Sequence, residues 1–150
     1  MSDEMALLVA DVYEAAGALR RSGEAIAASQ GQTQARWQLL SVASGTPLSV
    51  AQAARRLGVA RQGVQRIAND LVSEGLAAFG TNPDHRSSPL LELTSAGRQV
   101  LSEITARATE VHRLLAVDLP VSEITSARDL LRRLIDQVRR HQDGPAHPRA

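Results

Sequence analysis

The feature that most constrains the fold is a pair of short amphipathic segments joined by a glycine-containing turn. The first begins at Ser49, and Gln52 follows three residues later. This is the pattern of a capping box, in which each side chain satisfies a free backbone N–H at the start of a helix. The second begins near Ala60, two residues after Gly58, and ends at Gly75, where glycine can take the left-handed conformation. Two short helices with so tight a turn predict a helix-turn-helix.

Two further amphipathic segments precede this pair. Apolar residues at steps of three and four predict a helix over residues 3–29. Thr33 is a suitable N-cap for a second helix, from Gln34 to about Ala43. The side chains predicted to be buried in the second helix and in the helix-turn-helix are Trp37, Leu39, Leu40, Val50, Ala53, Ala54, Leu57, Val64, Ile67, Ala68 and Leu71.

The chain after Gly75 changes character. Residues 76–79 and residues 90–93 are short apolar runs that favour strands, and the polar loop between them carries Pro83 and Pro89. The sequence therefore predicts a β-hairpin with a long tip, placed directly after the helix-turn-helix.

The C-terminal part again has helical periodicity, over residues 95–117 and after the break at Pro120. Thr94 is expected to cap the first of these helices and Ser122 the second. Narrow apolar seams of this kind are typical of paired helices, either between two subunits or within one. The seam residues are Leu101, Ile104, Ala108, Val111 and Leu115, then Ile124, Ala127, Leu131, Leu134 and Val138.

Composition excludes several classes of protein. A chain of 150 residues suffices for one domain and is short for two. One Trp, one Tyr and one Phe argue against RNA and single-strand binders, which stack bases on aromatic rings. All 17 basic residues are arginine, and four lie between Arg55 and Arg66 without an acid among them. The absence of cysteine excludes disulfides and thiol chemistry.

Other functional classes lack a motif. There is no phosphate-binding loop, no nucleophile motif and no metal-ligand spacing among the four histidines, so we expect neither an enzyme nor a cofactor. No signal-peptide pattern or long apolar stretch is present, which predicts a cytoplasmic protein that does not contact membranes. Residues 142–150 are expected to form a disordered tail.

The most distinctive motif is Asp-x-Arg at residues 84–86, followed by Leu-Thr-x-x-Gly at residues 93–97. The segments before it are Gln34–Leu40, Leu57–Arg66 and Glu74–Leu76. In the order of these motifs the chain resembles the MarR family of bacterial transcriptional regulators, over about residues 33–105.

This resemblance implies a mainly α fold with a small β-hairpin wing. A winged helix-turn-helix at residues 34–98 would lie within a single domain of residues 1–150, between dimerisation helices at 1–32 and 99–141. The resemblance also implies a homodimer on double-stranded DNA, with a recognition helix in the major groove and a wing arginine in the minor groove. Many members are repressors that small, often phenolic, ligands release from DNA by binding between the dimer helices and the DNA-binding domain.

The expected DNA contacts follow from side-chain chemistry. Arg pairs with guanine and Gln with adenine through two hydrogen bonds each, and the first two turns of a recognition helix face the base edges. Arg61 suits a base or a phosphate equally, while Arg55 and Arg56 are phosphate contacts or solvated charges. Arg86 is expected to enter a narrow minor groove, and Asp84 to orient Arg86 or another basic side chain. The recognition-helix candidates are Arg61, Gln62, Gln65 and Arg66.

Two positions depart from the family pattern. Ala60 stands where Ser or Thr is usual, which removes a side-chain N-cap, and Gly63 replaces a small polar residue. An alternative class is a winged helix that binds another protein, which would need neither the helix arginines nor the wing arginine. Trp37 is a candidate for the ligand pocket or simply a core anchor of its helix. The residues that could line a small-molecule pocket are Tyr13, Arg36, Trp37 and His112.

Overall fold

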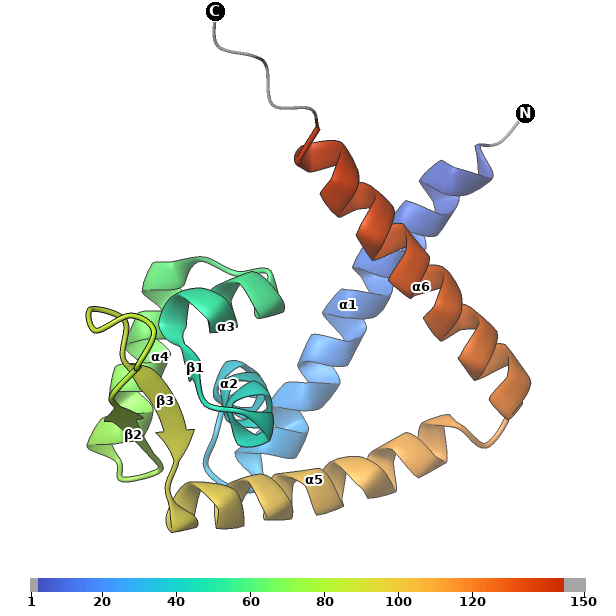
Figure 1. Cartoon of the computed structure of the whole chain (residues 1–150). Coiled ribbons are helices and arrows are strands. Elements are labelled where there is room, and N and C mark those ends of the chain that lie inside the picture. The colour runs from blue at the N-terminus through green and yellow to red at the C-terminus, as the bar shows by residue number, and fades with distance from the viewer. Residues whose placement is uncertain (1–2, 145–150) are drawn as a thin grey trace, which may run out of the picture. The chain divides into compact units, whose positions relative to one another are not determined.

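The computed structural model describes residues 3–144 (Figure 1). It is mainly helical with one small antiparallel sheet, as the sequence predicts. The chain divides into two compact units, the first ending at Thr109 and the second beginning at Glu110, within α5. In chain order the elements are α1 (Glu4–Ala28), α2 (Gln34–Gly45), β1 (Leu48–Ser49), α3 (Val50–Leu57), α4 (Arg61–Ser73), β2 (Ala77–Gly80), β3 (Leu90–Leu93), α5 (Ser95–Leu115) and α6 (Val121–Gln142).

Helix ends in the first unit are fixed by the residues that the sequence indicates. The amide of Gln52 donates to Ser49 Oγ at 3.2 Å, and the amide of Ser49 donates to Gln52 Oε1 at 2.9 Å, which confirms the capping box. Gly58 ends α3 and Gly75 follows α4, with φ of 68° and 77°. Only glycine takes this region without strain. Thr33 caps α2 through its side-chain oxygen, also as predicted.

The sheet has three antiparallel strands in the order β1-β3-β2. The β2–β3 hairpin is confirmed, although β2 extends to Gly80. The sequence analysis missed β1, in which Leu48 pairs with Leu91 and Ser49 with Leu90. A strand of two residues has no alternation to detect. Its consequence is that the start of α3 is joined to the hairpin, which we call the wing together with its loop at residues 81–89.

The core of the first unit lies between the helix-turn-helix, α2 and the sheet. The apolar pattern predicts that Trp37, Leu57 and Ile67 are buried, and the structure corrects this, because each remains partly exposed. They line two hollows between the helices, of about 340 Å³ and about 140 Å³, rather than the closed core. The largest fully buried side chains are Leu39, Leu40, Val64, Leu71, Leu91 and Ile104.

Thr94 joins the end of α4 to the start of α5. Its hydroxyl accepts from the amide of Gly97 at 3.1 Å, which confirms the predicted cap, and its amide donates to the Leu76 carbonyl at 3.1 Å. Gly97 is buried directly against this carbonyl, and a Cβ atom at Gly97 would overlap the Leu76 oxygen. The recognition helix and α5 are therefore linked by backbone contacts that need glycine at residue 97.

In the second unit, the predicted start of α6 is wrong. The helix begins at Val121, with Pro120 at the N-cap and no side-chain cap, so Ser122 lies inside the first turn. The Pro120 carbonyl accepts the amides of Glu123 and Ile124 at 3.0 and 3.1 Å. These two bonds place the first helical turn before a hydroxyl at residue 122 could cap it.

Much of the apolar surface of the second unit is uncovered. None of the residues of α6 is buried, and the seam residues Leu131 and Val138 are 38% and 46% exposed. Helix α6 continues to Gln142, and the rest of the predicted disordered tail, residues 145–150, lies outside the described residues. The exposed large apolar residues of this unit are Leu114, Leu115, Val117, Leu119, Val121, Leu130, Leu131, Ile135 and Val138.

Candidate nucleic-acid interface

Helix α4 has two distinct faces. Val64, Ala68 and Leu71 are buried against the rest of the first unit. The opposite face is polar and open to solvent, except that Gln65 is partly buried. Because helical side chains four residues apart share a face, the polar residues form two neighbouring stripes. This outward face holds the predicted Arg61, Gln62, Gln65 and Arg66.

A residue that the sequence analysis missed orients one of these side chains. Gln65 Nε2 donates to Asn69 Oδ1 at 3.0 Å, one helical turn further along. Amide pairs at this spacing stabilise each other's position on a helix. The Gln-to-Asn spacing of four residues was the available signal. Asn69 therefore joins the set of residues that α4 exposes to a partner.

The start of α4 matches the departure noted in the sequence. Ala60 is the N-cap and provides no side-chain hydrogen bond. A Cβ atom at Gly63 would meet no heavy atom within 4 Å, so the missing side chain leaves open space. Both positions lie on the first turn or its cap, where a recognition helix is closest to DNA.

The wing loop is held by its own hydrogen bonds. Asn82 is 9% exposed, and its Nδ2 donates to the Ser88 carbonyl at 2.9 Å while its Oδ1 accepts from the Asp84 amide at 3.1 Å. The His85 ring nitrogen Nδ1 lies 2.9 Å from Ser87 Oγ. Asn82 thus bridges both sides of the loop, a role that sequence reasoning did not assign.

Arg86 stands on this ordered loop with an exposed side chain. It borders a hollow of about 510 Å³ beside β2, together with Phe79 and Pro89. The predicted pairing with Asp84 is absent, since no ion pair between the two occurs in residues 3–144. The role of Asp84 in the structure is instead to donate its amide to the loop.

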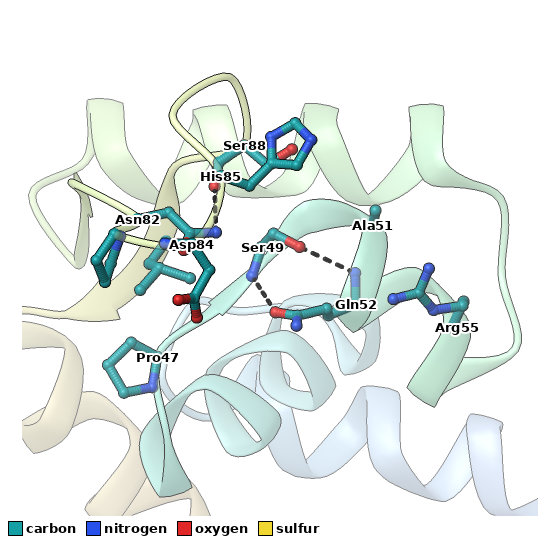
Figure 2. Close-up of a pocket in the computed structure, with 11 residues that line it drawn as sticks. Pro47, Ser49, Ala51, Gln52, Arg55, Asn82, Asp84, His85 and Ser88 are labelled. Atoms are coloured by element: carbon teal, nitrogen blue, oxygen red, sulfur yellow. Dashed lines mark hydrogen bonds between the residues drawn. The ribbon is translucent and has the colours of Figure 1, made fainter.

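A polar groove of about 490 Å³ separates the wing from the start of α3 (Figure 2). Arg55 reaches it from α3, and Asp84 and His85 reach it from the wing. Arg56, the neighbouring arginine, does not line it. The fold therefore distinguishes two arginines that the sequence analysis treated alike. The full lining is Pro47, Ser49, Ala51, Gln52, Arg55, Asn82, Pro83, Asp84, His85, Ser88 and Leu90.

Arg36, a predicted ligand-pocket residue, is engaged by acids of α4. Its Nη1 donates to Glu74 Oε2 at 2.7 Å and its Nη2 to Glu74 Oε1 at 3.2 Å. Its Nη2 also lies 3.8 Å from Asp70 Oδ2, and its Nη1 donates to Gln32 Oε1 at 3.3 Å. The guanidinium therefore links α2 to the end of the recognition helix.

The other three pocket candidates are not gathered with Arg36 into one cavity. Trp37 lines the 340 Å³ hollow with residues of α2 and with Leu57. Tyr13 is 75% exposed on α1, and His112 is an exposed residue of the second unit. Within residues 3–144 no group of three His, Asp or Glu side chains is placed to hold a metal ion. No helix of that part is long and apolar enough to cross a membrane.

These elements define a class of protein. A helix-turn-helix (α3 and α4), supported by α2 and followed by a β-hairpin that pairs with a short strand before α3, is a winged helix-turn-helix. A model of the MarR family matches residues 30–86, the part that contains α2 to α4 and the wing loop through Arg86. The chain belongs to the MarR family, whose proteins are transcription regulators rather than enzymes.

Relatives match over most of the chain. An uncharacterized protein of Mycobacterium tuberculosis is 63% identical over 135 residues, which cover 90% of this chain and 94% of the relative. The transcriptional activatory protein BadR of Rhodopseudomonas palustris is 27% identical over 144 residues, covering 90% of this chain and 80% of BadR.

Solved structures share the fold at lower identity. A MarR variant from Escherichia coli in complex with operator DNA has a TM-score of 0.75 and 20% identity, covering 89% of this chain and 99% of that chain. CouR from Rhodococcus jostii bound to p-coumaroyl-CoA has a TM-score of 0.75 and 19% identity, covering 88% and 92%. Family membership and fold together support a DNA-binding transcription regulator.

Proposed function

We propose that the protein represses transcription as a homodimer on an inverted-repeat operator. The observation that carries the proposal is the division of α4 into a buried apolar face and an exposed polar face, beside a wing that exposes Arg86. An exposed helix and hairpin of these dimensions fit the major groove and the neighbouring minor groove of B-DNA.

The proposed base contacts come from the exposed face of α4. Gln62 and Arg66 lie one turn apart, which suits readout of neighbouring base pairs, adenine by the amide and guanine by the guanidinium. Gln65, paired with Asn69, adds a second amide group to this surface. Arg61, next to the helix start, suits either a base edge or a phosphate.

The proposed backbone contacts flank the recognition helix. Arg55 lines the groove between α3 and the wing, where a phosphate strand would meet its guanidinium and the His85 ring. Arg56 is exposed on α3 outside this groove and is proposed as a weaker, less specific phosphate contact. Arg86 would enter the minor groove, whose negative potential favours arginine.

The dimer proposal rests on exposed apolar residues outside the DNA-binding region. Within one chain α6 buries no residue, although Ile135 and Val138 are 44% and 46% exposed. On α1, Leu7 and Leu19 are 50% and 58% exposed. Amphipathic helices with uncovered apolar faces normally pack against a partner. A second copy of the chain would supply such faces, and residues 1–32 and 99–141 are therefore proposed as the dimerisation segments.

We also propose that a small molecule regulates DNA binding. The support is that CouR, which shares the fold, was crystallised with p-coumaroyl-CoA. In this chain the hollow beside Trp37 is the open part of the predicted pocket, because Arg36 is engaged by Glu74. Tyr13 and His112 remain candidates. Titration of aromatic acids and their coenzyme A esters, with Trp37 fluorescence as readout, tests this part.

The experiment for DNA binding is selection of duplexes from a random pool, followed by footprinting. We expect an inverted repeat with half-site centres about 10 base pairs apart, and affinity that falls steeply with salt. Binding that ignored both sequence and salt would favour the alternative, a winged helix that recognises another protein. A reporter behind the selected operator separates repression from activation, the direction that the name of BadR indicates for that relative.

A further inference from the structure

We propose that Arg36 is a positioning residue of the recognition helix, and that its contacts with Glu74 and Asp70 fix how α4 faces the DNA. The inference rests on the proposed function, because it concerns the side chains that α4 presents to the bases. Its physical basis is an ionic contact between two helices that are distant in the sequence.

The contact has a defined geometry. Two hydrogen bonds of 2.7 and 3.2 Å join the Arg36 guanidinium to both oxygens of Glu74, and Asp70 lies 3.8 Å away. The Arg36 side chain is only 18% exposed, whereas those of Glu74 and Asp70 are 47% and 54% exposed. A planar guanidinium bound through two donors fixes direction as well as distance. Arg36 therefore restrains the rotation of α4 and not only its separation from α2.

The restrained acids belong to the same stripe as two proposed base contacts. Gln62, Arg66, Asp70 and Glu74 follow one another at intervals of four residues. Helical side chains at this interval lie above one another on nearly the same face. Arg36 thus holds one end of a stripe whose other end carries Gln62 and Arg66. A small rotation of α4 would move both ends together.

The electrostatics of the helix end make this contact necessary for Glu74. Glu74 is the C-cap residue of α4, where the partial negative charge of the helix dipole disfavours a carboxylate. The positive charge of Arg36 offsets that repulsion. The next residue, Gly75, is bound through its carbonyl by Thr94. The C-terminal end of α4 is therefore held from two sides, by α2 through Arg36 and by the start of α5 through Thr94.

A purely stabilising role is distinguishable from a positioning role. Ion pairs between partly exposed groups contribute little to stability, so the variants are expected to fold. We compare Arg36→Gln, Glu74→Gln and the double variant with Arg98→Gln, which removes the same charge from an exposed position on α5. The probes are the duplex recovered by selection and a scrambled duplex of equal length. Circular dichroism melts establish that each variant is fully folded at the assay temperature.

We expect each single variant to lose about tenfold in the ratio of the two affinities, since hydrogen bonds to charged groups have energies of this order. The double variant is expected to lose no more than either single variant, because the two side chains act as one unit. Arg98→Gln is expected to keep the parental ratio. An unchanged ratio in Arg36→Gln and Glu74→Gln, or losses that add in the double variant, would overturn the proposal.

A second measurement does not depend on DNA. Amide hydrogen exchange of the free protein is expected to become faster along residues 64–76 in Arg36→Gln and Glu74→Gln, relative to α3. Unchanged exchange there would also overturn the proposal. If the parent protein failed to discriminate between the two duplexes, the proposed function would fail, whereas the exchange data would still decide whether Arg36 holds α4.

Discussion

The Thr94 hydroxyl donates a hydrogen bond of 2.6 Å to the carbonyl of Gly75, 19 residues earlier in the chain. The same oxygen accepts the amide of Gly97 at 3.1 Å. One side chain therefore satisfies the free amide at the start of α5 and a carbonyl just beyond the end of α4. The Leu-Thr-x-x-Gly motif is explained by this contact, because its threonine makes both bonds and its glycine allows the close approach.

Gly97→Ala is expected to destabilise the protein by about 2 kcal/mol or more, because the added methyl group would overlap the Leu76 carbonyl. The matched control is Gly63→Ala, whose methyl group would meet open space. Since alanine favours a helix over glycine, this control should stabilise the protein by about 0.5–1 kcal/mol. Urea denaturation measures both. Equal effects of the two substitutions would contradict the close contact at Gly97.

Adding a cap to the recognition helix should raise stability. Ala60 provides no side-chain hydrogen bond at the N-cap of α4, so Ala60→Ser is expected to stabilise the protein by about 1 kcal/mol. Ser49→Ala, which removes the capping box of α3, should lower stability by a similar amount. Thermal unfolding of the two variants checks the signs. A lower melting temperature for Ala60→Ser would show that the start of α4 excludes a side-chain cap.

The wing contact should contribute affinity without base preference. Arg86→Ala is expected to weaken operator binding by about 1–3 kcal/mol and to reduce the salt dependence, with little change in the selected sequence. The control is Arg98→Ala, an exposed arginine on α5. Titrations at two salt concentrations on selected and scrambled duplexes provide the measurement. If Arg86→Ala bound both duplexes as the parent does, the wing would have no role in binding.

The α4 contacts should behave differently from the wing. Gln62→Ala and Arg66→Ala are expected to cost about 1–3 kcal/mol on the selected duplex and much less on the scrambled one. Selection repeated with each variant should relax one position in each half-site. Asn69→Ala should have a smaller effect on discrimination, because it only frees the Gln65 amide. Full discrimination retained by both Gln62→Ala and Arg66→Ala would refute base readout by this stripe.

The parent protein is expected to sediment at about twice the mass of one chain at micromolar concentration. Leu131→Glu should shift it towards the monomer, since Leu131 is an exposed seam residue of α6 and a buried charge at a dimer interface is costly. Val59→Glu is the control, because Val59 is equally apolar and 53% exposed but lies in the turn before α4. A parent protein that sedimented as a stable monomer would exclude the proposed dimer.

The sequence predicted best what depends on a few neighbouring residues. Ser49 with Gln52, Gly58, Gly75 and Thr94 marked helix ends correctly, because caps and left-handed glycines act within one turn. Ser122 failed for the same local reason, since a proline two residues earlier had already started the helix. Buried faces were predicted less well where hollows open between helices, as beside Trp37.

Contacts between distant segments could not be predicted in this way. Arg36 and Glu74 are 38 residues apart, and no periodicity relates a residue of α2 to the C-cap of α4. The strand β1 needed its partner β3 to be recognised. Arg55 and Arg56 are adjacent in sequence, and only the position of the wing separates the one that lines the groove from the other. The polar residues of α4 were predicted to be exposed, but the pairing of Gln65 with Asn69 was not.

The bridging position of Asn82 has a thermodynamic consequence for the wing. An unrestrained loop would lose about 1–2 kcal/mol of backbone entropy per residue on becoming ordered against DNA. Here the Asn82 side chain already joins the two sides of the loop through Ser88 and Asp84. That entropy is lost during folding and does not enter the association equilibrium. Arg86 would therefore approach the minor groove from a rigid support, and the free energy of its contact would appear almost undiminished in the dissociation constant.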